Sequence, residues 1–148
     1  MPIPTSDLSL DEARAIIAGA FAKAAELKLK PLAVAVLDAG GHIRSIERQD
    51  GASMHRPEIA IGKAYGALAM GLGSRELANR VKERGAVFLD AVNGMLDGRL
   101  IPAPGGVLVR DAAGNVIAAV GISGDASEQD EACAVAGIAA AGLEAVTG

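Results

Sequence analysis

The sequence has one cysteine, Cys133, and two histidines among its 148 residues. This scarcity excludes an intrachain disulfide framework and a zinc or iron–sulfur site built from several cysteines. The longest uncharged apolar run lies between Glu131 and Glu144, well short of the roughly 20 residues that a membrane-spanning helix needs. The N-terminal residues lack the basic and apolar regions of a signal peptide. We therefore expect a cytoplasmic protein with no membrane contact.

Basic charge and aromatic side chains are also scarce. The chain has 14 Lys and Arg against 18 Asp and Glu, which argues against nucleic acid as a partner because a basic surface supplies most of the affinity for phosphates. It has two Phe, one Tyr and no Trp, yet 51% of its residues are hydrophobic and 19 are glycine. The core must therefore consist of small and branched aliphatic side chains. The length fits a single domain.

Local patterns predict four helices and two hairpins before the last helix. Ser9 and Glu12 have the spacing of a capping box and predict a helix from Leu10 to about Lys28. Extended runs at 32–38 and 43–49, and at 107–111 and 116–123, each flank a glycine-containing turn and predict two hairpins. Further helices are predicted from Pro57 to near Gly71, in a charged and solvated segment from Ser74, and within 86–96.

The last helix is the most apolar segment. Ser127 is its predicted N-cap, with Glu128, Asp130 and Glu131 in the first turn, where negative charge is favourable. Residues 132–143 are apolar on every side, which is typical of a helix buried all round. One sheet face rarely covers a whole helix in so short a chain, so we expect a second subunit to cover it and to form the ligand crevice. The element order predicts an α/β fold with an antiparallel sheet.

Short motifs in both halves of the chain resemble a known family. The first half carries residues 37–43 (Leu-Asp-Ala-Gly-Gly-His-Ile), 48–52 (Arg-Gln-Asp-Gly-Ala) and 63–64 (Lys-Ala). The second half carries 104–107 (Pro-Gly-Gly-Val), 120–124 (Val-Gly-Ile-Ser-Gly) and 129–131 (Gln-Asp-Glu). In this order they resemble the HbpS/GlcG-like haem-binding (haem-degrading domain) family. The sequence departs from the common family pattern at 107–109, after the paired glycines, and in the loop 53–56, both near the expected ligand pocket.

The resemblance implies a profilin-like α/β sandwich, with an antiparallel sheet of about five strands flanked by helices. It implies one domain over 1–148 with a loose tail at 1–8, assembled as a homo-oligomer (a dimer or a larger ring). It also implies binding of haem or a related planar, carboxylated small molecule, and haem degradation in some members.

Haem needs an apolar slot, an axial ligand and often cations for its propionates. The axial ligand that we predict is His55, in a loop ahead of a helix and beside Met54 and Arg56. His42 reads as a solvated turn residue and Cys133 as a buried small side chain; Tyr65 and Met54 complete the set of candidate iron ligands. The chain has no Cys-x-x-Cys-His motif, so haem is not attached covalently.

Cations and bare backbone complete the predicted ligand site. Lys63 lies among alanines, and is either a snorkelling surface residue or a cation that faces a carboxylate with a lowered pKa. The Gly105-Gly106 pair either admits a ligand or bends a strand. The ligand-binding residues that we predict are Arg48, His55, Arg56, Lys63, Gly105, Gly106, Ser123 and Gln129.

Two other functional classes remain open. An enzyme of small hydroxy- or keto-acid catabolism, without a bound metal, would use Lys63 and Asp130 as its catalytic groups. A free amine on Pro2 would be a further general base. A structural or regulatory interaction module would bind no small molecule.

Overall fold

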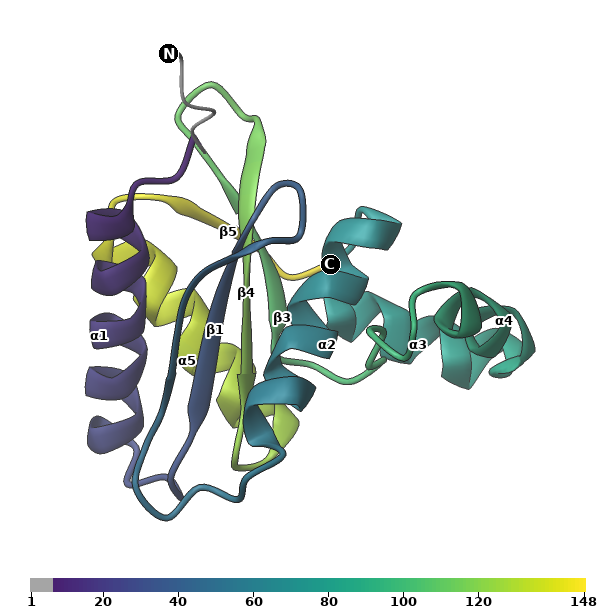
Figure 1. Ribbon diagram of the computed structural model, residues 1–148, viewed down its shortest axis with the longest axis horizontal. Coiled ribbons are helices and arrows are strands. Elements are labelled where there is room, and N and C mark those ends of the chain that lie inside the picture. The colour runs from purple at the N-terminus through teal and green to yellow at the C-terminus, as the bar shows by residue number, and fades with distance from the viewer. Residues whose placement is uncertain (1–6) are drawn as a thin grey trace.

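Five antiparallel strands form one open sheet in the computed structural model of the chain, which describes residues 7–148. The strands are β1 (Ala33–Asp38), β2 (Ile43–Arg48), β3 (Gly106–Arg110), β4 (Val116–Ser123) and β5 (Glu144–Val146), in the spatial order β2-β1-β4-β3-β5. The two predicted hairpins therefore lie side by side, with Val36 of β1 opposite Val120 of β4. This pairing buries the two central strands and leaves β2 and β5 as the edges (Figure 1).

Helices cover both faces of the sheet (Figure 1). Helices α1 (Leu10–Glu26) and α5 (Ser127–Ala140) pack side by side on one face, and α2 (Arg56–Met70) covers the other. Helices α3 (Ser74–Arg84) and α4 (Val87–Met95) project beyond α2 as an arm. The predicted α/β sandwich is thus confirmed.

Small side chains and glycines set the distance between the layers. The larger core, between the sheet and the pair α1 and α5, is aliphatic; the smaller one, beneath α2, includes Ala64, Ala67 and Ala119. A methyl group on Gly121 of β4 would overlap the carbonyl group of Ala60, so the backbone of α2 lies directly on the strand. The closeness of α2 to the sheet therefore depends on the absence of a side chain there.

Several local predictions hold, and the reasons are visible. Ser9 Oγ accepts a hydrogen bond from the Glu12 amide at 3.0 Å, and Glu12 Oε1 accepts one from the Ser9 amide at 3.0 Å, which completes the predicted capping box of α1. Gly71 ends α2 in a left-handed conformation, with φ of 69°. Helix α3 is less solvated than predicted, because Ser74 and Leu77 are buried.

The C-terminal predictions were wrong in two respects. Helix α5 ends at Ala140, and residues 144–146 form the edge strand β5, whose three residues are too few for a periodic pattern. Ala126 occupies the N-cap, and no side-chain hydrogen bond caps the helix; Asp130 Oδ1 instead accepts a hydrogen bond from the Asp125 amide at 3.0 Å. Within the single chain, α1 and the sheet cover one side of the helix and leave Ala139 and Ala140 exposed, as expected of a helix that one sheet face does not cover; its burial by a second subunit stays a prediction.

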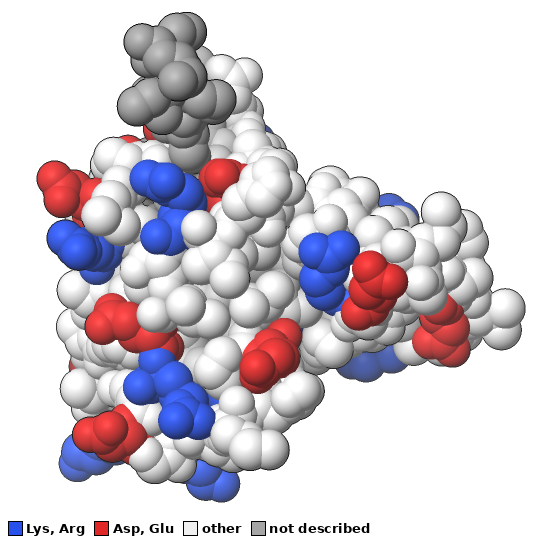
Figure 2. Space-filling view, in the orientation of Figure 1, with Lys and Arg blue, Asp and Glu red and all other residues white. Residues whose placement is uncertain are grey.

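Leu8, which we expected to belong to a loose N-terminal tail, is fully buried in the larger core. Residues 1–6 lie outside the described residues, and the role predicted for Pro2 falls there. Among residues 7–148, no helix is both long and apolar enough to span a bilayer. On the face shown in Figure 2, Lys and Arg are interspersed with Asp and Glu, without a basic patch.

Candidate functional site

Lys63 and Asp130 form a buried ion pair that joins the two layers of helices at the end of β4. Lys63 Nζ, on α2, lies 3.2 Å from Asp130 Oδ2, in the first turn of α5, and donates a hydrogen bond to the Ile122 carbonyl at 2.9 Å. The two side chains are 4% and 1% exposed. Lys63 is therefore a buried cation that faces a carboxylate, and the snorkelling interpretation was wrong.

Burial perturbs both members of this pair. Removal from water lowers the pKa of Lys63, against the opposing effects of the Asp130 charge and hydrogen bond. It also raises the pKa of Asp130, against the Lys63 charge and the hydrogen bonds from the backbone and Lys63. Both directions have one cause, because a low-dielectric interior disfavours each charged form. Strongly perturbed groups of this kind cluster at functional sites but also occur in structural ion pairs.

Other predicted site residues surround the pair. Arg56 Nη1 donates to Ser123 Oγ at 3.1 Å, and the positive charge of Arg56 contributes to the lowered pKa of Lys63. Gly105, with φ of 122°, lies so close that a methyl group on it would be 2.9 Å from Lys63 Nζ. The sequence therefore identified residues that the fold brings together, from α2, the approach to β3, the end of β4 and the start of α5.

The glycines of this cluster serve internal packing. A methyl group on Gly106 would overlap the Lys63 carbonyl, and the Gly106 amide donates to Ser74 Oγ at 2.7 Å. Ser74 Oγ in turn donates to the Ala103 carbonyl at 2.6 Å, which fixes the loop before β3. The close approach that the two glycines permit within the chain is that of α2; their contact with a ligand stays a prediction.

The remaining predicted residues lie elsewhere on the surface. His55 immediately precedes α2, its side chain is 72% exposed, and its Nδ1 lies 3.7 Å from Glu58 Oε2. Arg48, at the end of β2, lines a broad cleft with Phe21 and Pro31 on the α1 side of the fold. Gln129 is exposed in the first turn of α5. The fold therefore separates Arg48 from the buried pair and leaves His55 open to solvent.

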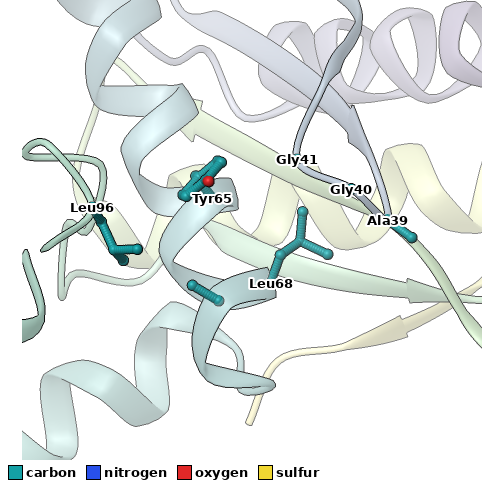
Figure 3. Close-up of a pocket in the computed structure, with 7 residues that line it drawn as sticks. Ala39, Gly40, Gly41, Tyr65, Leu68 and Leu96 are labelled. Carbon is teal, nitrogen blue, oxygen red and sulfur yellow. The ribbon is translucent and has the colours of Figure 1, made fainter.

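A second concave site lies between the β1–β2 turn and α2 (Figure 3). This groove, the Tyr65 groove, has a volume of about 140 Å³ and is lined by Ala39, Gly40, Gly41, Tyr65, Leu68, Ala69 and Leu96. Tyr65 packs on the bare backbone of Gly41, where φ is 82° and a methyl group would be 2.6 Å from the ring. The Arg99 guanidinium lies 4.0 Å from the centre of the Tyr65 ring. The sequence named Tyr65 as a candidate ligand but gave no signal for Arg99, because the two are 34 positions apart.

The sequence profile of the haem-degrading HbpS-like protein family matches residues 8–139. The chain belongs to the HbpS-like family. The resemblance noted from the short motifs is thereby confirmed, and 132 of the chain's residues (8 to 139) fall inside the match.

Relatives of this HbpS-like chain carry differing descriptions. It is 32% identical over 124 residues to an uncharacterized 15.0 kDa protein in the dhaT-dhaS intergenic region of Citrobacter freundii, over 83% of this chain and 84% of that protein. It is 30% identical over 138 residues to the corrinoid adenosyltransferase PduO of Citrobacter freundii, over 93% of this chain but 40% of PduO. A crystal structure described as a PduOC:haem complex superposes with a TM-score of 0.81 at 29% identity, over 92% of this chain and 96% of that one.

Proposed function

We propose that this protein binds haem or a closely related planar, carboxylated molecule. The observation that carries the proposal is the likeness, over nearly the whole chain, to a structure that is described as a haem complex. The family description points the same way. The match to PduO covers a minority of that enzyme, so we do not extend its adenosyltransferase activity to this chain.

Exposed side chains ahead of α2 support the predicted iron contact. His55 is open to solvent, and Met54 beside it is 83% exposed, so two soft ligands are available without rearrangement. Arg56 at the start of α2 is a cation for a propionate, although it already donates to Ser123. We propose that a ring held at this surface has His55 as its axial ligand and lies partly between subunits.

A titration with hemin tests both levels of this proposal. We expect a shift of the Soret band with the wild-type protein and its loss in His55→Ala. His42→Ala is the matched control, since His42 is also largely exposed and similarly close to an acidic partner, Asp38. An unshifted Soret band in the wild type would refute haem binding and favour a structural or regulatory module. If His55→Ala and His42→Ala gave the same Soret shift as the wild type, the His55 assignment alone would be refuted.

Haem degradation is the finer expectation that the family description carries. It predicts that bound haem, in air and with ascorbate as reductant, loses its Soret absorbance faster than the same haem in solution or on an unrelated binding protein. Equal rates would limit the function to binding.

A second candidate function rests on the buried ion pair. We propose that Lys63 and Asp130 take part in the chemistry of a small hydroxy or keto acid, because a desolvated lysine exchanges protons near neutral pH more readily than an exposed one. This function requires the loop around Gly105 to open, since both side chains are closed to solvent in the isolated chain. Thermal-shift assays with small 2-hydroxy and 2-keto acids test it: the expected stabilisation would be absent from Asp130→Asn, and no shift in the wild type would reject it.

Self-association is the third part of the proposal. Helix α4 presents Val87, Phe88 and Met95 to solvent, with exposures of 85%, 69% and 83%. At about 100° per residue these three side chains fall on one side of the helix, whereas Leu89 of the same helix is buried. Contiguous exposed apolar side chains often mark an interface. Light scattering is expected to give a mass of at least two chains, and Phe88→Asp is expected to lower it; a monomeric wild type would contradict this.

A further inference from the structure

We infer that the Tyr65 groove is a binding site for a planar, single-ring carboxylate, with the ring against Gly40, Leu68 and Leu96 and its carboxylate directed to Arg99, which stacks on Tyr65. This inference is independent of haem binding. It concerns a different surface from that of His55 and requires no iron.

The volume of the groove selects one ring. Its volume of about 140 Å³ is close to the roughly 150 Å³ of an engineered apolar cavity that takes up benzene. A whole tetrapyrrole is several times larger, so the groove fits a five- or six-membered ring. Flat surfaces favour a planar ring: Tyr65 and Gly41, which are in contact with each other, contribute an aromatic ring and bare backbone to the lining (Figure 3).

The walls are apolar and pre-formed. Gly41 has φ of 82° and contacts the Tyr65 ring, so the turn cannot carry a larger residue without displacing that ring. Asp38 Oδ1 accepts hydrogen bonds from the Gly40 amide at 2.9 Å and the His42 amide at 3.0 Å, which holds the turn in shape. A ligand therefore meets a rigid surface and loses little affinity to ordering of the protein.

Arg99 supplies a cation without a carboxylate partner among residues 7–148. Its Nε donates to the Leu96 carbonyl at 2.9 Å, and its guanidinium lies over the Tyr65 ring. These two contacts hold the side chain to Tyr65 and to the Leu96 backbone, both of which belong to residues that line the groove, and no carboxylate of the described residues pairs with it. A guanidinium held in this way presents its remaining N–H groups to an anion. Charge complementarity thus selects a carboxylate on the ring.

The chain carries its own reporter for this site. Tyr65 is its one tyrosine and it has no tryptophan, so tyrosine fluorescence comes from the groove alone. Titration with benzoate is expected to change that fluorescence with a dissociation constant of about 1 mM or lower. Benzamide has the same ring without the charge, and cyclohexanecarboxylate has the charge without a planar ring; both are expected to bind at least about fivefold more weakly.

Two variants with matched controls complete the test, with binding followed by calorimetry. Arg99→Met is expected to weaken benzoate binding at least about fivefold, and Arg84→Met, at an exposed arginine of α3, to leave it unchanged. Ala69→Trp is expected to fill the groove and abolish binding, whereas Ala18→Trp, at an exposed alanine of α1, is not. No response of wild-type Tyr65 up to about 10 mM benzoate, or equal affinities for wild type and Ala69→Trp, would overturn the inference. Either result leaves the hemin titration, and so the proposed haem binding, unaffected.

Discussion

Replacement of Lys63 by methionine is expected to destabilise the fold by about 3–5 kcal/mol, the usual cost of removing one partner of a buried ion pair. Methionine fills a similar volume but leaves the Asp130 carboxylate, 1% exposed, without its cation, and leaves the Ile122 carbonyl without its donor. A domain of this size has a free energy of unfolding of about 5–15 kcal/mol, so the loss is a large fraction of the total. Urea denaturation at neutral pH measures it directly.

The stability lost in Lys63→Met is expected to depend on pH, in a direction that follows from the pKa of Asp130. Burial already raises the pKa of Asp130 from 3.8, and without Lys63 nothing cationic opposes that effect as closely. The native state then binds a proton more tightly than the unfolded state, so stability falls as pH rises from 3.8 through the native pKa. We therefore expect the defect of Lys63→Met to be larger at about pH 7 than at about pH 4.5.

A second substitution separates charge from packing. Asp130→Asn in the Lys63→Met background removes the unpaired charge, while an amide oxygen still accepts the hydrogen bond from the Asp125 amide. The double variant is therefore expected to be more stable than Lys63→Met at neutral pH. The reasoning would be refuted if Lys63→Met cost less than about 1 kcal/mol, or if Asp130→Asn added to its defect.

Three other predictions concern stability and reactivity. Ser9→Ala is expected to cost about 1 kcal/mol in thermal or urea unfolding, and Ser127→Ala much less, because Ser9 caps its helix and Ser127 does not; equal costs would contradict the assignment of the caps. Gly121→Ala is expected to cost at least about 2 kcal/mol through overlap with the backbone of α2, whereas Gly94→Ala, in open space on α4, is expected to raise the melting temperature slightly. Burial raises the pKa of Cys133 to about 11, so a thiol reagent is expected to label it at neutral pH only after unfolding, and rapid labelling of the native protein would show that α5 opens.

Elements with strong local signals were predictable from the sequence. The capping box fixed the start of α1, and the glycine turns fixed both hairpins, because these features depend on residues within a few positions of one another. Ser127 misled the assignment of the α5 cap, because serine at a helix start is a common cap but the chain there places Ala126 in the cap position. β5 was missed because a three-residue edge strand is defined by its partner, β3.

The sequence also identified residues of both candidate sites, but it did not show which of them contact one another. Lys63 and Asp130 were named separately, and their contact follows from the placement of α2 and α5 on opposite faces with their side chains meeting at the end of β4. Tyr65 was named as a possible ligand, but its contacts with Gly41 and Arg99 join segments that are distant along the chain.

The amino-acid sequence by itself determined which segments are helices and strands, and that the core consists of small side chains. It also indicated the family, through the order of its motifs. Periodicity, turns and motifs are all patterns along the chain. The tertiary structure alone decided that Lys63 is buried against Asp130, that the backbone of α2 lies against Gly106, and that Arg99 lies over Tyr65. These are contacts between distant segments. Their energies depend on burial and on distance in space, neither of which sequence spacing specifies.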